Sequence, residues 1–198
     1  MKKILQKAQK HCLKLLANSR CKNLPFHNEK HTIEVYENVL KIGIYENKDL
    51  QELEPVLLAA LFHDTGNGFV FEGHERYSVI EAGNFLRSKN YPAAKIAEVV
   101  VCINATQLSK RPDTINEKII CDADMFHLGT PSYRSKNELL RNEWANFRNI
   151  IYSDSEWHKL NLHFLRQHRF YTQYGTKILE PQKQKNQKEL NDLVQQSN

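Results

Sequence analysis

An apolar run at residues 56–62 that ends in the adjacent pair His63 and Asp64 is the feature that most restricts how this chain can fold. The run predicts a buried helix, and Pro55 just before it is a residue favoured in a first turn. Residues 66–68 (Gly-Asn-Gly) predict the end of that helix. An imidazole and a carboxylate are costly to bury unless something satisfies them. The pair has two interpretations. It is either a capped helix end with a hydrogen-bonded histidine or part of a divalent metal site.

The composition favours an all-helical chain. Only 7 glycines and 6 prolines occur among 198 residues, and the sequence is rich in Leu, Ile, Lys, Glu and Gln. This length suits one domain, and the sequence contains no repeat or linker that would mark a second one. We therefore expect a single irregular bundle of about seven to nine helices.

Several local patterns predict where helices lie. Apolar residues recur at helical spacing over residues 2–17, which predicts an amphipathic helix at the start of the chain. Ser135 with Glu138, and Ser153 with Glu156, form capping-box patterns. Each of these two pairs predicts the first turn of a helix.

Charge and cysteine usage argue against several classes of protein. The formal net charge of +5 is mild, and the lysines near both ends are expected on solvated helix faces, so we expect no nucleic-acid partner. The first residues carry lysine throughout, unlike a signal peptide, and no stretch is long and apolar enough for a membrane. The 4 cysteines have no C-x-x-C spacing and are expected to be reduced. These features predict a cytoplasmic protein without a membrane partner.

Four polar side chains lie on or at the end of apolar helical segments: His31, His63, Asp64 and Asp124. Any one of them alone would more often be a hydrogen-bonded structural residue. Together, their nitrogen and oxygen atoms suit a divalent transition metal or magnesium better than a thiolate-rich zinc site. Asp122 competes with Asp124 for the last position.

The same residues carry a resemblance to a known family. They are His31, the pair His63-Asp64, Asp124, LLAALFHDTG at residues 57–66 and DADM at residues 122–125. This ordered set resembles the HD superfamily of metal-dependent phosphohydrolases. The segment HNEKHT at residues 27–32 is also similar to the His-Asn-x-x-His segment of cyclic-nucleotide phosphodiesterases, a branch of that superfamily.

The resemblance implies an all-α fold, an irregular helical bundle of the HD-domain type with a central metal site. We expect this domain to extend over residues 1–180, with its motif core at about residues 25–130. Residues 181–198 are rich in Gln, Lys and Asn, which predicts a polar C-terminal tail or a solvated, fraying helix.

The resemblance also implies the ligands of a divalent metal ion, whether Mn, Fe, Zn, Ni or Mg: His31, His63, Asp64 and Asp124. Asp124 is preferred to Asp122 because the aspartate of the family usually follows a small residue and precedes an apolar one. That context surrounds Asp124 in this sequence.

Further roles follow from the resemblance and from side-chain chemistry. His27 corresponds to the general acid of the phosphodiesterase branch, and the alternative is an imidazole that caps the helix. Asp64 is expected to be catalytic as well as a metal ligand. His74 would bind a second metal bridged by Asp64, contact a substrate phosphate, or only cap a helix. Lys110 and Arg111 are candidate phosphate clamps or solvated loop charges.

The predicted function is hydrolysis of a phosphate ester of a nucleotide, or of a similar small phosphorylated metabolite, by metal-activated water. A cyclic-nucleotide or other phosphodiesterase is one alternative, favoured by HNEKHT but weakened by Asn67, where those enzymes usually have a histidine. A non-catalytic, metal-stabilised module that senses a nucleotide is the other. Helices after residue 130 would form a wall for the substrate or the face of a homodimer.

Overall fold

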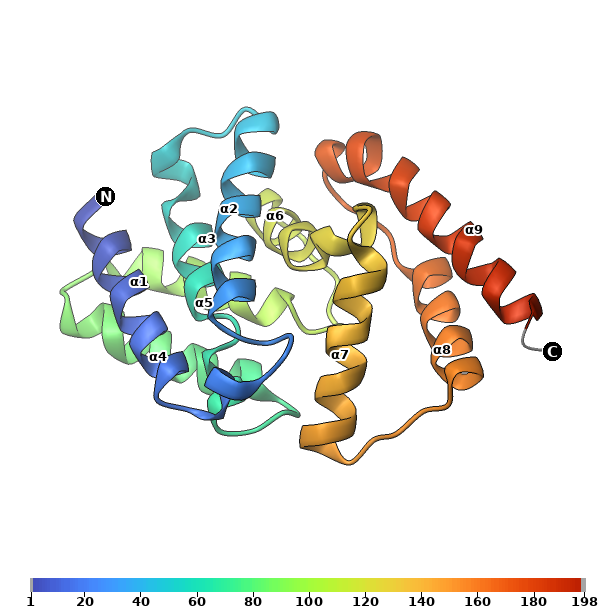
Figure 1. Ribbon diagram of the computed structural model, residues 1–198. Helices are drawn as coiled ribbons and strands as arrows, with labels where there is room; N and C mark the ends of the chain where they lie inside the picture. Colours follow the sequence, from blue (N-terminus) through green and yellow to red (C-terminus); the bar gives the residue numbers. More distant parts are fainter. Residues whose placement is uncertain (1, 197–198) are drawn as a thin grey trace.

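The structure, a computed structural model, describes residues 2–196, and within this range its secondary structure is helical with no strand (Figure 1). The prediction of an all-α bundle is confirmed. The described residues form nine α-helices: α1 (Lys2–Ala17), α2 (Glu29–Tyr45), α3 (Leu50–Phe62), α4 (His74–Ser88), α5 (Ala93–Ala105), α6 (Ile115–Asp124), α7 (Tyr133–Arg148), α8 (Asp154–Gln167) and α9 (Glu180–Gln196).

Four short helical segments connect some of these helices: η1 (Arg20–Asn23), η2 (Thr65–Gly68), η3 (Met125–Gly129) and η4 (Gly175–Leu179). Across residues 2–196, no helix combines the length and the apolar character that crossing a membrane requires.

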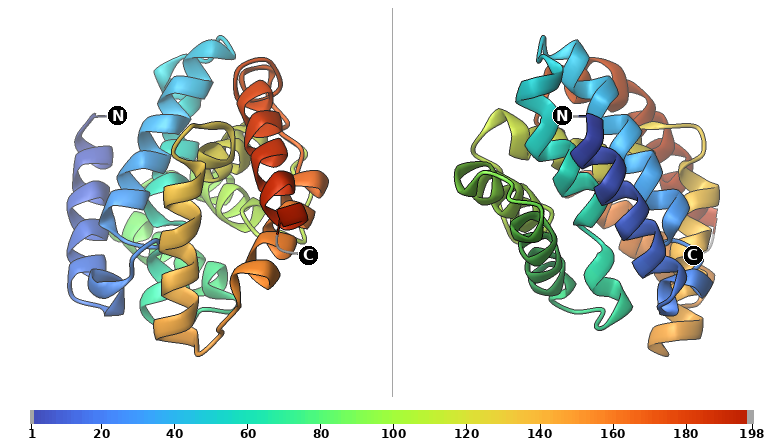
Figure 2. Two further views of the ribbon diagram at one scale, coloured as in Figure 1. Left: turned by 45° about the vertical axis from the view of Figure 1, so that its right-hand side comes forward. Right: turned by 90° about the vertical axis from the view of Figure 1, so that its left-hand side faces the viewer.

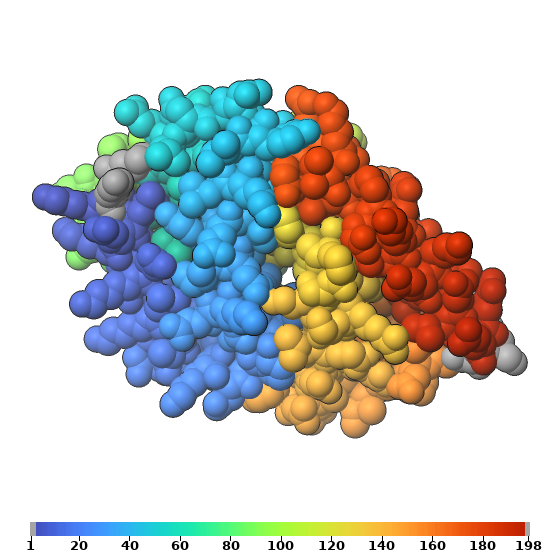
Figure 3. Space-filling view, turned by 45° about the horizontal axis from the view of Figure 1, so that its top comes forward, coloured from blue at the N-terminus to red at the C-terminus, as the bar shows by residue number. Residues whose placement is uncertain are grey.

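The helices form two groups that meet along a seam. Helices α1 to α6 make up one group, and α7 to α9 lie beside it (Figures 1 and 2). The space-filling view shows the same division, with the blue and cyan residues on one side and the yellow to red residues on the other (Figure 3). Each group has its own apolar core. The first is built from α1 to α6, and the second from α7, α8 and α9 together with η3 and η4.

Helix α3 is the centre of the larger core. Every side chain at residues 53–62 is buried, and α1, α2, α5 and α6 all contact this helix. Full burial of one Leu or Val side chain stabilises a fold by about 1.5–3 kcal/mol relative to exposure, so an apolar helix is covered on all its sides. The end of α3, which carries His63 and Asp64, is therefore held firmly in the middle of the molecule.

The structure corrects the expected start of this helix. It begins at Leu50 and not at Pro55, because the Asp49 carboxylate accepts the backbone N–H groups of Gln51 and Glu52. The Glu52 carboxylate accepts the Asp49 N–H in return, which completes a capping box. Pro55 therefore lies inside the helix. Its missing N–H affects only the carbonyl of exposed Gln51, which water can bond instead.

One of the two capping boxes predicted from the sequence is confirmed and the other is wrong. Ser153 and Glu156 each accept the backbone N–H of the other at the start of α8. Helix α7 instead begins at Tyr133, before Ser135. The Ser135 hydroxyl donates to the Ser132 carbonyl, so this serine lies in the first turn of α7 and does not cap it.

The end of the chain differs from the solvated or fraying segment that the sequence predicts. Helix α9 packs against α8 and η3 and buries Lys183, Asn186 and Leu190. The buried Lys183 ammonium donates to the carbonyl of His168, so a residue type that usually marks a solvated surface here joins α9 to the segment after α8. The last two residues of the predicted tail, 197 and 198, lie outside the described residues, and the domain boundary at residue 180 stays a prediction.

Candidate metal centre and active site

Three helices bring His31, His63 and Asp124 together. His31 lies on α2, His63 follows the last residue of α3, and Asp124 ends α6. The candidate ligand atoms of these three side chains all lie within 4.8 Å of one another. Asp124 Oδ1 is 3.1 Å from His31 Nε2 and 3.6 Å from His63 Nε2. Three of the four residues that the sequence predicts as metal ligands therefore converge.

Asp64, the fourth predicted ligand, contacts both histidines but is not a member of that mutually close group of three. Its Oδ2 lies 3.4 Å from His31 Nε2 and 3.2 Å from His63 Nε2. Its Oδ1 accepts a hydrogen bond from the Asn67 amide and lies 3.1 Å from His74 Nε2. Asn67, at the position where a histidine is usual in cyclic-nucleotide phosphodiesterases, thus orients the Asp64 carboxylate.

The hydrogen bonding around His63 leaves free the atoms that a metal ion would need. His63 Nδ1 donates to the Ala60 carbonyl at 2.8 Å, so Nε2 is the nitrogen that carries the lone pair for an ion when the imidazole is neutral. Within the described residues, His63 Nε2 and Asp64 Oδ2 are buried and lack a hydrogen-bond partner. Two ligands each about 2.1 Å from one ion lie about 3–3.5 Å apart, close to the measured N–O separations. The residues present therefore fit a divalent ion.

The electrostatics of the cluster also favour a cation. Burial works to raise the pKa of Asp64 and of Asp124, but the neighbouring imidazoles hold the pKa of both carboxyls well below its usual range. Burial works to lower the pKa of His63, yet the Asp64 and Asp124 carboxylates hold it well above its usual value. Two buried carboxylates thus keep their charge and require positive charge beside them.

The turn after α3 is fixed by Ser78 of α4. The Ser78 hydroxyl donates to the His63 carbonyl at 2.6 Å and accepts the Gly66 N–H at 2.9 Å. A Cβ atom on Gly66 would lie 1.9 Å from the backbone oxygen of His74, so no side chain fits at this position. The glycine that the sequence identifies as a helix end also allows α4 to approach closely enough for His74 to reach Asp64.

His74 begins α4 and lies beside the cluster. Its Nδ1 is 2.9 Å from the Phe71 carbonyl, and its Nε2 faces Asp64 Oδ1. Burial lowers the pKa of His74, but the hydrogen bond to the Asp64 carboxylate outweighs burial and raises the pKa to about 9. His74 is thus positioned to share Asp64 with a cation or to carry positive charge itself.

Asp122 does not face the histidines. Its buried carboxylate accepts the backbone N–H groups of Tyr171 and Thr172 and the Thr172 hydroxyl, at distances from 2.7 to 3.1 Å. These bonds hold the segment before η4 against α6. Of the two aspartates that compete in the sequence, Asp124 is the one that lies beside His31.

His27 lies just before α2 and outside the helix. The helix begins at Glu29, with Asn28 as the N-cap residue whose side chain accepts the backbone N–H of His31. His27 and His31 therefore do not share a helix face, which the sequence spacing would give if the helix began earlier. Their rings nevertheless meet edge to face, with centroids 5.8 Å apart.

A buried glutamate on α7 fixes the His27 ring. Glu143 Oε1 lies 2.5 Å from His27 Nδ1, and Oε2 accepts the backbone N–H groups of Phe26 and His27, each at 2.9 Å. Burial works to lower the pKa of His27, but the charge of Asp64 and the hydrogen bond to Glu143 raise it. Within the described residues, Nε2 of His27 makes no hydrogen bond, so this nitrogen can serve a ligand.

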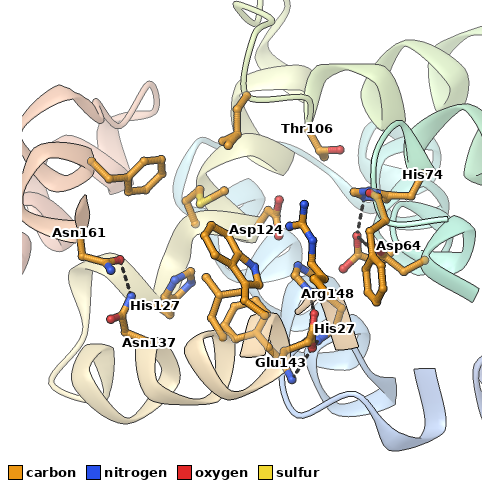
Figure 4. Close-up of a pocket in the computed structure, with 18 of the residues that line it drawn as sticks. His27, Asp64, His74, Thr106, Asp124, His127, Asn137, Glu143, Arg148 and Asn161 are labelled. Carbon is orange, nitrogen blue, oxygen red and sulfur yellow. Dashed lines mark hydrogen bonds and ion pairs between the residues drawn. The ribbon is translucent and has the colours of Figure 1, made fainter. Parts of the chain in front are cut away.

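A cavity of about 320 Å³ opens between these residues, along the seam between the two groups of helices. Its lining includes His27, Asp64, His74, Asp124 and Arg148. In Figure 4 the Arg148 side chain extends from α7 into the end of the cavity that Asp64 and His27 also line, and its Nη2 lies 3.3 Å from the exposed Glu72 carboxylate. This end of the cavity therefore combines the candidate ligands with a guanidinium group and an oriented imidazole.

Lys110 and Arg111 lie in a second cavity, of about 700 Å³, together with Arg169. The two cavities share lining residues, among them Asp124 and Met125. The two loop cations are exposed and are not part of the ligand cluster. The structure thus places them in a cavity that Asp124 also lines and that His27 does not line.

The sequence analysis did not identify Glu143 or Arg148. Both lie on α7, whose sequence reads as an ordinary amphipathic helix with many charged residues. Glu143 is 1 % exposed, which is unusual for a glutamate and identifies it once the structure is known. In the sequence, nothing distinguishes Glu143 from the more exposed Glu138 of the same helix.

Comparison with protein families gives a match to the HD domain over residues 28–129, about half of the chain. The chain therefore belongs to the HD superfamily of metal-dependent phosphohydrolases. No curated protein and no solved structure matches it.

The family match defines the general chemistry of the site. HD domains bind divalent metal ions and are typical of metal-dependent hydrolases that act on small phosphorylated substrates. The cluster of His31, His63 and Asp124 could hold such an ion. The matched segment contains all four candidate ligands and ends before α7, so Glu143 and Arg148 are additions from the C-terminal group of helices.

Proposed function

We propose that this protein is a metal-dependent hydrolase that cleaves a phosphate ester of a nucleotide or of a similar small phosphorylated metabolite. One observation carries the proposal. The cluster of buried ligand atoms, two of which lack a hydrogen-bond partner among the described residues, borders a cavity that also contains an oriented histidine. A site that only stabilised the fold would need neither the cavity nor the histidine.

His31, His63, Asp64 and Asp124 would hold the ion. When bound, a divalent metal such as Mn, Fe, Zn, Ni or Mg lowers the pKa of water and offsets negative charge on a phosphoryl group. Asn67 fixes the direction of the Asp64 carboxylate, and the Ala60 carbonyl fixes the tautomer of His63. These contacts hold the ligand atoms in place before any substrate arrives.

His27 would protonate the oxygen that leaves phosphorus. The imidazole, which lines the cavity, is held through Nδ1 by Glu143; this contact leaves Nε2 for the ligand and favours the protonated form. A buried carboxylate paired with an imidazole is a common arrangement for orienting a catalytic histidine. This role predicts that His27 matters most for substrates whose leaving group is a poor one.

Several cationic side chains would bind phosphoryl oxygens. Arg148 lines the first cavity, with its guanidinium beside the Trp144 ring and 3.3 Å from the exposed Glu72 carboxylate, and a planar guanidinium matches a phosphoryl group. His74 would either contact the phosphate or bind a second metal bridged by Asp64, because its Nε2 faces Asp64 Oδ1. Lys110 and Arg111 would interact with a more distant anionic part of the substrate in the second cavity.

The meeting of two cavities at Asp124 favours a phosphodiester as the substrate. A diester carries a second organic substituent on phosphorus, and the two cavities adjoin at Asp124, which lines both of them. A phosphomonoester would use only one of them. Hydrolysis of cyclic or linear nucleotide diesters, including the cyclic-nucleotide phosphodiesterase activity, is therefore the second candidate within the same class of reaction.

The metal content of the wild-type protein and of Asp64→Ala, both purified without added metal or chelator, tests the proposal. We expect about one or two equivalents of a divalent metal in the wild type, measured by plasma mass spectrometry. The variant should lose the metal together with hydrolysis of a panel of nucleotide mono- and diesters. Asp113→Ala, a change at an exposed loop aspartate, is the matched control and should retain both.

Full activity in a metal-free Asp64→Ala protein would overturn the proposal. A wild-type protein that binds no transition metal would next be titrated with magnesium, and failure of both experiments would also overturn it. A protein that keeps its metal and binds a nucleotide tightly, but hydrolyses nothing, would instead be the nucleotide-sensing module that the sequence leaves as an alternative.

Two predictions from the sequence concern the cell and the assembly. The cytoplasmic location is consistent with four cysteines that are all free, as expected in a reducing compartment. The homodimer remains a prediction, and size-exclusion chromatography with light scattering tests it directly.

A further inference from the structure

The end of the first cavity that lies away from the ligand cluster is mainly apolar. It is enclosed by apolar and aromatic side chains of η3, α7 and α8: Leu128, Leu140, Trp144, Trp157, Leu160 and Phe164. The labelled charged residues of the cavity gather around Asp64, Asp124 and Glu143, whereas Asn137 and Asn161 lie at the opposite end (Figure 4). The cavity is thus charged at one end and apolar at the other.

Two buried amides interrupt this apolar end. Asn137 of α7 and Asn161 of α8 are 8 % and 7 % exposed, and both line the cavity. Asn137 Nδ2 donates to Asn161 Oδ1 at 2.6 Å, and Asn137 Oδ1 accepts from Trp157 Nε1 at 2.7 Å. Asn161 Nδ2 donates to the Trp157 carbonyl at 2.8 Å. These bonds fix both amide planes.

The fixed amides have hydrogen-bonding capacity to spare. A carboxamide carries two N–H donors and an oxygen that accepts twice. Asn137 and Asn161 each use one donor and one acceptor in the bonds above. Each therefore retains one N–H and one lone pair without a partner in the part of the chain that the structure describes. Buried donors and acceptors of this kind cost free energy until a ligand or water satisfies them.

We propose that this end of the cavity binds a planar heteroaromatic group, of the kind found in a nucleobase, and that Asn137 and Asn161 recognise its edge. Such a ring has apolar faces, which suit the half-buried Trp144 and Phe164, and an edge with adjacent donors and acceptors, which suits two oriented amides. A purely apolar group would leave the amides unsatisfied. A sugar or polyol would leave hydroxyl groups against the apolar walls.

This inference rests on the proposed function in one respect: the ring is taken to belong to the same substrate whose phosphate ester lies at the ligand cluster. The cavity volume of about 320 Å³ lies at the lower end of the range of small-molecule sites, roughly 300–1,000 Å³. It leaves room for one ring system and the group that links it to phosphorus. Binding of the ring itself needs neither a metal nor hydrolysis.

The two tryptophans provide a direct test, because the chain contains only 2 and both line this cavity. Tryptophan fluorescence of the full chain would be titrated with adenosine, guanosine, cytidine and uridine, excited at the red edge of tryptophan absorption. Ribose 5-phosphate and benzyl alcohol are the controls for a phosphorylated sugar and for an apolar ring. We expect saturable quenching by at least one nucleoside, with an affinity at least about tenfold above that of both controls.

Asn161→Asp tests whether the amides recognise the edge of the ring. The carboxylate can still accept from Asn137 but can no longer donate, so the preference among the four nucleosides should change, by about tenfold or more for the best one. Asn146→Asp is the matched control, an exposed asparagine on α7, and should keep the wild-type preference. Circular dichroism and the Tm establish that each variant is folded.

The outcomes separate this inference from the proposed function. Nucleoside binding without any hydrolysis would support the inference and contradict the function. Hydrolysis of phosphate esters with no preference for a heteroaromatic group, and no quenching by nucleosides, would overturn the inference alone. Equal quenching by benzyl alcohol, or an Asn161→Asp variant with unchanged preference, would also overturn it.

Discussion

The contact between His27 and Glu143 joins residues that are far apart in the chain. Glu143 satisfies two backbone N–H groups as well as the imidazole, so its carboxylate is fixed in position although it is buried. A buried carboxylate that is fully hydrogen-bonded retains its charge and holds a proton on the imidazole. The pair is therefore built to keep a proton available at His27 Nε2.

Glu143→Gln should slow the hydrolysis of poor leaving groups selectively. The amide oxygen can still accept the two backbone N–H groups, but the negative charge that favours protonated His27 is lost. We expect kcat for a nucleotide ester to fall by about 10²-fold, with a much smaller loss for a p-nitrophenyl ester, whose leaving group needs no proton. Steady-state kinetics with both substrates measure the difference.

His27→Asn should give the same pattern, and Glu138→Gln on the same helix, whose carboxylate is largely exposed, should behave as the wild type. Metal content should be unchanged in all three variants. An equal decrease in kcat for both substrates would show that His27 and Glu143 do not act by proton donation.

At the scale of elements, helix α7 is the wall of the site that faces the ligand cluster. Asn137, Leu140, Trp144 and Arg148 recur at helical spacing and all line the first cavity. The helix is held against the N-terminal group by Glu143 and by an ion pair between Lys136 and Glu34. One face of α7 therefore sets the distance between the metal centre and the apolar end of the cavity.

Arg148→Met should weaken binding of the phosphoryl group. A charge-assisted hydrogen bond to phosphate is worth about 1.5–3 kcal/mol, so we expect KM to rise by about tenfold or more, with a smaller effect on kcat. The Kd for inorganic phosphate, measured by isothermal titration calorimetry, should rise in parallel. Arg141→Met is the control, since Arg141 pairs with Asp154 away from the cavity. An unchanged Kd would exclude Arg148 from phosphate binding.

The sequence predicts the metal side of the site better than the substrate side. His31, His63 and Asp124 could be recognised because each is a polar residue in an apolar helix, where burial demands an explanation. Glu143 could not be recognised, because its burial arises from contacts with residues more than 100 positions earlier in the chain. The start of α3 was missed for a local reason, since the capping box at Asp49 outweighs the preference of Pro55 for a first turn.

At the scale of the whole molecule, a polar contact between His168 and Lys183 is one of those that join the C-terminal group of helices. The carbonyl of His168 accepts a hydrogen bond from the buried ammonium of Lys183 on α9. The ring of His168 packs edge-on against Phe170 and beside Phe164. Lys183, which is itself paired with Glu180, and then His127 and Arg169 contribute positive charge near the ring.

The protein should lose stability in mild acid because of His168. Burial, and then the charge of Lys183, lower the pKa of His168 to about 3, whereas an unfolded histidine has a pKa of about 6.5. The unfolded state thus binds the extra proton first, and this contribution is full above about pH 6.5 and is lost as the pH falls toward about 3. We expect a decrease of at most about 1.4 kcal/mol per pH unit.

Urea unfolding of the wild type and of His168→Asn at about pH 7 and about pH 5 measures this effect. The variant should lose less stability than the wild type over that interval. An identical pH dependence in the two proteins would show that another group causes the loss.

The candidate metal ligands and the walls of the cavity lie mainly on different groups of helices, which affects how substrate preference can change during evolution. The candidate metal ligands come from α2, α3 and α6, whereas the walls that would select the organic part of the substrate come mainly from α7 and α8. The buried residues of the two cores are different, although Phe126 and Tyr174 pack against both, so many changes in one group leave the core of the other intact. New substrate preferences could therefore arise through mutation of α7 and α8 alone, with the same metal chemistry inherited unaltered.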